Sequence, residues 1–244
     1  MTNPTLILVP GAWHKVCIYN KVLENQALSS FKHILVELPT NGATGDPELP
    51  TTLSWDPDVH AIRDAIAAEI KAGNRVLLVT HSYGSVVGQE ALKYFADEMG
   101  MIRHLIIAGF LLDVGESTTG LRGGKEPEWY DLRGNLVYVR DGAKRFYNDL
   151  PESEAAKLEA ELLPQTLVTK SSPITYPAWK HVPTTYLSCE NDAAIPIERQ
   201  RWMIERAQKT ARDFKVVTCS AGHSPFLSMP EVVADLIQKT AGEF

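Results

Sequence analysis

Short apolar runs rich in β-branched residues alternate with amphipathic stretches along the chain. Most of these runs are continuously apolar, which is typical of strands in a parallel sheet covered on both faces. Strands that alternate with helices form βαβ units with right-handed crossovers, so we expect an α/β fold on a mainly parallel six-stranded sheet. The predicted strands are Thr5–Val9, Ile34–Leu38, Val76–Val79, Leu105–Ala108, Thr184–Ser188 and Phe214–Thr218.

Helix start and stop signals mark the stretches between these strands, and we expect the helices to cover both faces of the sheet. Asp56-Pro57 places a proline in a first helical turn, and Gly73 predicts that this helix ends at Ala72. The other predicted helices are Ser85–Met99, Pro196–Lys209 and Pro230–Thr240.

One segment, Asp113–Val182, interrupts the alternation because it contains no obvious core strand. It begins with several glycines, has a short strand-like run at Leu136–Val139, and then predicts two polar helices near Ala143–Leu150 and over Glu152–Leu163. A long insertion in a compact sheet is more often a binding element than a passive loop. We therefore expect a single domain over residues 1–244, with a mostly helical cap over 113–182 inserted after the fourth strand.

Composition narrows the possible partners and cellular location. The 244 residues suit one α/β domain, and a net charge of −6 argues against a nucleic acid or an anionic membrane as partner. No apolar run approaches the roughly 20 residues of a membrane-spanning helix. Three cysteines without CxxC spacing argue against a disulfide framework or a zinc site. We expect a cytoplasmic monomer or homodimer that acts on a small-molecule substrate without a cofactor or metal.

The stretch Val76–Gly88 carries the clearest chemical signal. A buried strand leads through Thr80-His81-Ser82-Tyr83-Gly84 into a helix, which is the context of a nucleophile elbow. The tight turn would lift the Ser82 hydroxyl above the sheet edge, where the helix N-terminus favours negative charge. Thr80 stands where such elbows usually have glycine, and Ser-x-Gly alone also fits a strand-to-helix turn with a capping serine.

Two later strand ends supply the partners that a serine nucleophile needs. Asp192 and His223 follow the fifth and sixth predicted strands, in the chain order of this type of triad. The histidine takes the serine proton, and the carboxylate holds the imidazole in the required tautomer. Asp113 and Glu190 are the alternative acids, and we prefer Asp192 to both.

The loops around these residues predict the rest of the site. Backbone amides of Ala12 and Tyr83 are expected to hold the oxyanion. His14 fits substrate contact and structural hydrogen bonding equally well. An apolar pocket would favour an uncharged or aromatic ester. The expected substrate-binding residues are Trp13, His14, Trp129, Tyr130 and Phe226, whereas the histidines expected at surface or strand-edge positions without a functional role are His33, His60, His104 and His181.

Taken together, these motifs resemble the α/β-hydrolase superfamily over nearly the whole chain. More narrowly, they are similar to the small capped enzymes that include plant methylesterases and α/β-hydrolase-fold hydroxynitrile lyases, and to uncharacterised fungal and bacterial hydrolases. The resemblance implies a Ser82–Asp192–His223 triad. It rests on Leu8–His14, His81–Gly84, Asp192 with Ile195-Pro196, Gln200–Glu205 and Gly222–Phe226.

Two departures from the lyases favour hydrolysis. The lyases carry a threonine in the oxyanion loop and a lysine directly after the catalytic histidine, where this chain has Gly11 and Ser224. Without that lysine, no cation is expected to stabilise departing cyanide. We expect a serine hydrolase that cleaves a carboxylic ester or lactone of a small, largely apolar metabolite. The alternatives are C–C bond cleavage or a non-hydrolytic biosynthetic step on a polyketide-like substrate, and a receptor-like protein that binds a ligand.

Overall fold

A six-stranded parallel sheet forms the centre of the molecule in the computed structural model, which describes residues 3–42 and 54–244. The strand order is β2-β1-β3-β4-β8-β9, and every neighbouring pair is parallel. The six predicted strands are confirmed, although β2 is shorter than expected. Their bounds are β1 Thr5–Val9, β2 His33–Leu35, β3 Val76–His81, β4 Ile102–Ile107, β8 Thr184–Cys189 and β9 Phe214–Cys219.

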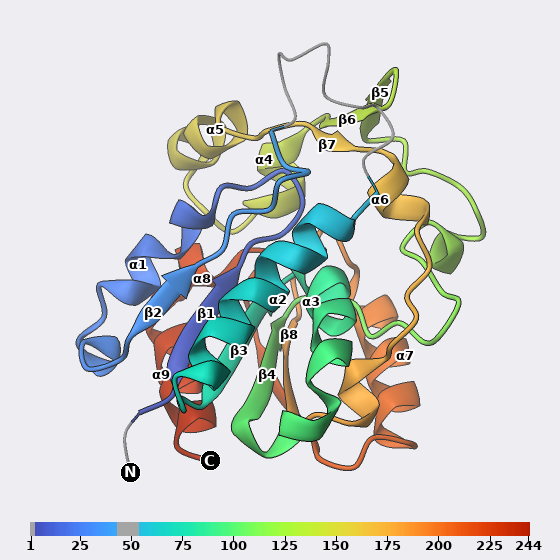
Figure 1. Ribbon diagram of the computed structural model, residues 1–244. Helices are drawn as coiled ribbons and strands as arrows, with labels where there is room; N and C mark the ends of the chain where they lie inside the picture. Colours follow the sequence, from blue (N-terminus) through green and yellow to red (C-terminus); the bar gives the residue numbers. More distant parts are fainter. Residues whose placement is uncertain (1–2, 43–53) are drawn as a thin grey trace.

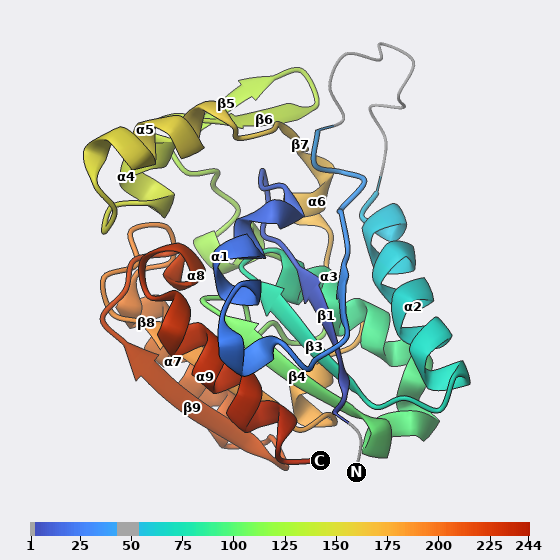
Figure 2. The ribbon, with the colours of Figure 1, turned by 90° about the vertical axis from the view of Figure 1, so that its left-hand side faces the viewer.

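Helices cover both faces of this sheet, as Figures 1 and 2 show. On one face α2 (Asp56–Lys71) and α3 (Gly84–Leu92) pack on β1 and β3, and on the other face α9 (Pro230–Ala241) packs on β3 and β4. Gly73, with φ 78°, follows the end of α2. The predicted helix Ser85–Met99 is shorter than expected, because α3 gives way at Lys93 to an irregular 3-10 stretch. The remaining elements here are η1 Val16–Tyr19, α1 Asn20–Leu23, η2 Gln26–Leu28, η3 Lys93–Met101, α7 Ile197–Gln208 and α8 Pro225–Ser228.

Burial along the strands explains why the hydrophobic pattern of the sequence predicted them. Every residue of β1, β3 and β8 is buried, because helices cover both faces of these strands. Continuous apolar runs follow from this position. The edge strand β9 instead alternates between half-buried and exposed positions for most of its length. All six strands point the same way, so their carboxyl ends meet at one edge of the sheet.

Most of the segment between β4 and β8, residues 113–182, lies at that edge, at the top of Figure 1, and its last part returns past α3 to the start of β8. The segment contains helices, as expected, but it also contains a three-stranded antiparallel sheet in the order β5-β6-β7. Gly134-Asn135 joins β5 to β6, and Gly134 has the positive φ of 59° that such a tight hairpin requires. The elements are η4 Gly120–Arg122, β5 Tyr130–Arg133, β6 Leu136–Val139, α4 Gly142–Phe146, α5 Glu152–Ala160, β7 Gln165–Thr166, α6 Val168–Ser171 and η5 Ala178–Lys180.

Candidate active site

The turn after β3 places Ser82 in a backbone conformation that few side chains adopt. Its φ is 49°, and its N–H donates to the Ile107 carbonyl while its own carbonyl accepts from Ser85 Oγ at 2.6 Å. Gly84 is required two residues later, because a Cβ there would lie 2.4 Å from the Pro10 carbonyl oxygen. These contacts hold a strained turn with the Ser82 side chain raised above the strand end.

Thr80, which replaces the usual glycine of this motif, fits through two neighbours. A Cβ at position 88 would lie 2.8 Å from Thr80 Cγ2, so Gly88 leaves the room that the threonine methyl occupies. The Thr80 hydroxyl lies 2.8 Å from His104 Nε2. The expected surface or strand-edge position of His104 is therefore wrong: the residue is fully buried in β4, and burial lowers its pKa to about 3.

Asp192 and His223 meet at the ends of β8 and β9. His223 Nδ1 lies 2.8 Å from Asp192 Oδ2, and both side chains are buried. The other carboxylate oxygen accepts from the backbone N–H groups of Ala194 and Ile195, each at 2.8 Å, and Gln200 Nε2 donates to Oδ2 at 3.1 Å. This aspartate is thus fixed by three groups besides the histidine.

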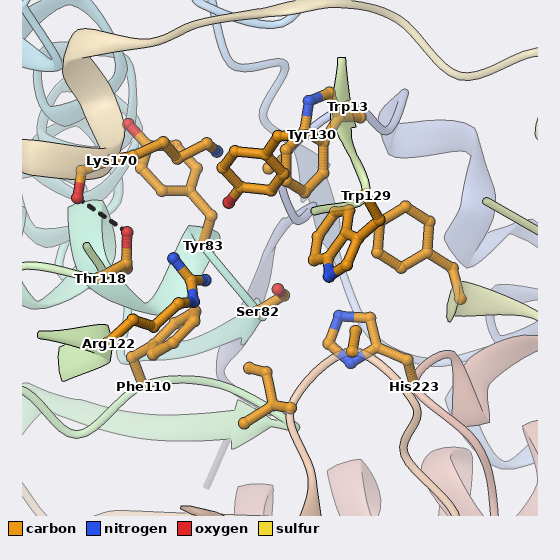
Figure 3. A pocket seen from close by; sticks show the side chains of 14 residues that line it. Trp13, Ser82, Tyr83, Phe110, Thr118, Arg122, Trp129, Tyr130, Lys170 and His223 are labelled. Carbon is orange, nitrogen blue, oxygen red and sulfur yellow. Dashed lines mark hydrogen bonds between the residues drawn. The ribbon is translucent and has the colours of Figure 1, made fainter. Parts of the chain in front are cut away.

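Ser82 and His223 face the same cavity, with the Ser82 hydroxyl directed toward its centre (Figure 3). Among the residues described, Ser82 Oγ has no hydrogen-bond partner. Contacts between a nucleophile and its base are often loose before substrate binds, so this geometry leaves the pair available for proton transfer.

The alternative acids lie elsewhere. Asp113 is bound by Lys180 Nζ at 2.8 and 2.7 Å. Burial raises the pKa of Asp113, but the hydrogen bonds and charge of Lys180 outweigh it and hold this pKa below its usual value. Glu190 is exposed. Neither carboxylate makes a hydrogen bond to His223 in the described structure, in contrast to Asp192.

The two backbone amides expected to hold an oxyanion also border the cavity. Ala12 and Tyr83 both line it, and within the described parts of the chain neither of their N–H groups donates to another residue. His14 supports this loop, because its Nδ1 donates to the Ala12 carbonyl at 2.6 Å and its Nε2 accepts from Tyr147. Burial lowers the pKa of His14 to about 4, consistent with a neutral ring.

The aromatic residues predicted to contact substrate divide into two groups. Trp13, Trp129 and Tyr130 line the cavity over Ser82. Phe226 does not, because it is fully buried and packs against the rings of Tyr19 and His81. His14, described above, does not line this cavity either. Phe226 and His14 thus lie outside the lining of the cavity over Ser82, and contact of either residue with a substrate stays a prediction.

Two cations correct the expectation of an apolar pocket without positive charge. Arg122 of η4 and Lys170 of α6 line the cavity, and Figure 3 shows them across Ser82 from His223. Both come from the segment 113–182, where the sequence offered no motif that marks them. Folding brings them to Ser82 through contacts between distant segments, such as the 2.9 Å hydrogen bond from Thr118 Oγ1 to the Lys170 carbonyl.

The space available differs sharply along the site. The cavity over Ser82 measures about 20 Å³, roughly the room that one water needs. A neighbouring cavity of about 360 Å³ shares walls with it, including Arg122 and Trp129. Ser82 therefore lines a small cavity that adjoins a larger one.

This geometry can be compared with known proteins. The profile of the "Alpha/beta hydrolase family" matches residues 6–236. The chain belongs to this family. It is 32% identical to the alpha/beta hydrolase nvfD of Aspergillus novofumigatus, over 100% of this chain and 98% of that protein. Methylesterase 7 of Arabidopsis thaliana is 22% identical, over 98% of this chain and 96% of the relative.

Solved structures share the fold of this α/β hydrolase. A pyrethroid hydrolase from Sphingobium faniae JZ-2 superposes with a TM-score of 0.75 at 20% identity, over 98% of each chain. The protein is thus a hydrolase of the α/β type. Within residues 3–42 and 54–244, each helix is too short or too polar to cross a bilayer.

A buried polar network lies behind the cavity of this α/β hydrolase. Asp58 accepts hydrogen bonds from Tyr83 Oη at 2.9 Å, from Thr40 N at 2.9 Å and from Thr40 Oγ1 at 2.5 Å. Gln165 Nε2 donates to Thr40 Oγ1 at 3.1 Å, and Gln165 Oε1 accepts from Lys170 Nζ. The network ties Tyr83, which follows Ser82, to the segment 113–182.

Proposed function

We propose that this α/β hydrolase cleaves a carboxylic ester or lactone of a small molecule through an acyl-Ser82 intermediate. The observation that carries the proposal is the 2.8 Å hydrogen bond between His223 Nδ1 and Asp192 Oδ2, beside the cavity that Ser82 faces. With Nδ1 bonded to a carboxylate, a neutral His223 has Nε2 free to accept the serine proton.

The proposed reaction has two halves. His223 takes the proton from Ser82 Oγ as the oxygen attacks the ester carbonyl, and then gives it to the leaving alcohol. Ala12 and Tyr83 N–H groups donate to the oxyanion of the tetrahedral intermediate, each lowering the barrier by about 3–4 kcal/mol. In the second half His223 activates a water, which releases the acid from Ser82.

Names of relatives agree with ester cleavage. Besides the methylesterase, a methyl jasmonate esterase from Vitis vinifera is 23% identical over 92% of this chain. The superposed structure noted above is named for pyrethroid hydrolysis. These likenesses do not specify the substrate, so the proposal extends to the reaction and not to a particular ester.

The segment 113–182 acts as a cap in this proposal. It supplies Trp129, Tyr130, Arg122 and Lys170 to the cavity walls. The space over Ser82 is small, about 20 Å³, and it adjoins the larger cavity that would hold the rest of the substrate. The proposed partner is a small molecule that reaches a cytoplasmic monomer or homodimer, and the net charge of −6 argues against a nucleic-acid partner.

Cyanohydrin cleavage remains the contrasting reaction to test. Arg122 and Lys170 provide positive charge in the pocket, so the absence of a lysine after His223 no longer argues against it by itself. Hydrolysis is favoured because two backbone amides border the space over Ser82, where a tetrahedral oxyanion would form. Ser224, directly after His223, is buried and has no side-chain partner among the described residues.

Covalent labelling tests the nucleophile, and product analysis tests the reaction. A fluorophosphonate should label the wild-type protein and leave Ser82→Ala unlabelled. A panel of 4-nitrophenyl esters and aryl lactones should be hydrolysed, with mandelonitrile incubated in parallel. Release of cyanide and aldehyde from mandelonitrile, with no ester or lactone accepted, would show that the hydrolysis proposal is wrong. Failure of labelling and of both reactions would favour the receptor-like alternative.

A further inference from the structure

Neither Arg122, which is half-buried, nor Lys170, which is buried, forms an ion pair with a carboxylate of the described residues. Charged side chains are rarely buried unless an opposite charge or a full set of hydrogen bonds compensates for lost water. Arg122 Nη1 is buried and has no hydrogen-bond partner. In the portion of the chain that the structure describes, no carboxylate oxygen lies within 4.0 Å of the Arg122 guanidinium.

The acidic residues near this pair make no ion pair with Arg122, although Glu198 lines the same larger cavity. Glu126 Oε1 accepts from Thr119 Oγ1 at 2.8 Å, and its other oxygen is buried without a partner. Asp58 already accepts three hydrogen bonds, from Thr40 and Tyr83. The guanidinium of Arg122 instead lies beside Tyr130, with its Cζ 5.8 Å from the ring centroid.

Lys170 adds a second positive group to the same wall. Its side chain is buried, with Nζ bound to Gln165 Oε1 and lying 4.1 Å from the Trp13 ring centroid and 4.7 Å from that of Tyr83. Burial, and next the charge of Arg122, lower the pKa of Lys170 well below its usual value, and they outweigh the opposing charges of Asp58 and Glu126. An anion bound nearby would favour the ammonium form, because opposite charges stabilise each other in a water-poor site.

We propose that Arg122, supported by Lys170, binds a carboxylate of the substrate, so that the preferred ester also carries a free acid group. This inference rests on the ester hydrolysis proposed above and names its substrate class. Arg122 borders both the narrow space over Ser82 and the larger adjoining cavity, so a carboxylate a few bonds from the ester can reach it. The planar guanidinium can donate two parallel hydrogen bonds to a carboxylate.

A matched pair of esters tests the proposal. Mono-4-nitrophenyl glutarate has a free carboxylate, and methyl 4-nitrophenyl glutarate has the same chain with that group neutralised. The wild-type enzyme should favour the half-ester by about 10- to 100-fold in kcat/KM, the range expected for hydrogen bonds to a charged group. Arg122→Gln should bring this ratio close to one, mainly through the KM of the half-ester, and Arg122→Lys should restore part of it.

Two further variants separate the subsite from general effects. Lys170→Met keeps a long side chain in the buried space and should lower the ratio less than Arg122→Gln. Arg201→Gln removes the same charge from an exposed position of α7 outside both cavities, and its ratio should match the wild type. Equal losses with both esters in Arg122→Gln would assign Arg122 a structural role and overturn the proposal.

The outcomes also distinguish this inference from the proposed function. Ser82-dependent hydrolysis of both esters at equal kcat/KM would leave ester hydrolysis standing and show that the carboxylate subsite is wrong. If neither ester reacts, a binding measurement on the inactive variant tests the carboxylate subsite instead. Monomethyl glutarate should raise the melting temperature of Ser82→Ala protein more than dimethyl glutarate does, and Arg122→Gln should abolish the difference. No such difference would refute the subsite.

Discussion

The two walls of the cavity over Ser82 are built on different principles. On the sheet side, Ser82, Asp192 and His223 each follow a parallel strand, so the register of the sheet brings them together. On the cap side, Arg122 and Lys170 come from short helical turns joined by side-chain and loop contacts. Under the proposed function, we expect the sheet wall to determine which bond is attacked and the wall from residues 113–182 to determine which molecule presents that bond.

The largest effect should come from the sheet wall. Ser82→Ala should reduce ester turnover by about a millionfold, as removal of the serine does in other triad hydrolases. Because Ser82 Oγ makes no hydrogen bond to any described residue, the melting temperature should change little. Turnover and thermal unfolding of the purified variant provide the measurement, and wild-type activity would remove Ser82 from the mechanism.

The second test compares two aspartates after neighbouring strands. Asp192→Asn should lower kcat by about 10⁴-fold, since an amide favours the wrong imidazole tautomer. Asp113→Asn should change kcat less than about threefold, because Asp113 binds Lys180 rather than His223. Steady-state kinetics on one ester compare the two variants, and a larger loss from Asp113→Asn would reverse the assignment of the acid.

A cap-wall substitution should act on substrate choice rather than on bond breaking. Trp129 borders both cavities, so Trp129→Ala should raise KM about tenfold with kcat changed less than about threefold. The control is Trp202→Ala, which removes an indole from α7 that is 44% exposed and lies outside both cavities. If Trp129→Ala lowered kcat and left KM unchanged, the assignment of substrate choice to this wall would be wrong.

The smallest effect concerns pH and the loop beneath the oxyanion site. His14 has a pKa of about 4 when folded and 6.5 as its ordinary value, so between these pH values the unfolded chain binds the additional proton. Stability from this residue is therefore present above pH 6.5 and is lost as pH falls toward 4.

His14→Gln should flatten the acid side of the stability profile by up to about 1.4 kcal/mol per pH unit in this window. Denaturant unfolding at several pH values measures the slope. His60→Gln, which alters an exposed histidine, is the matched control. An unchanged slope in the His14 variant would show that this ring does not titrate on unfolding.

The central sheet could be predicted from the sequence, whereas much of the segment 113–182 could not, because the two regions differ in burial and strand length. Central strands such as β1 and β3 are buried on both faces, so their continuous apolar runs identified them, and parallel pairing then placed the candidate triad at one edge. The strands of the segment 113–182 are short and partly exposed, and of these only β6, Leu136–Val139, was expected from the sequence. A local pattern could not show that Arg122 and Lys170 meet over Ser82.

The sequence patterns also failed to predict which side chains are buried behind the site. His104 is polar, and its place inside β4 depends on a hydrogen bond to Thr80 from a neighbouring strand. Phe226 adjoins His223 in the chain, yet its ring packs away from the cavity against Tyr19. Adjacency in sequence to a site residue does not fix the direction of a side chain, because that direction depends on contacts between distant segments.

Thr80 bears on how distant members of this family are searched for. Its methyl group occupies the volume that a side chain at position 88 would need, so a larger residue at position 80 requires glycine at position 88. A search that scores each position separately penalises threonine at the first and ignores the compensating glycine at the second. Treating positions 80 and 88 as a coupled pair, with two admissible combinations of small and larger residues, would recover elbows that the usual glycine signature overlooks.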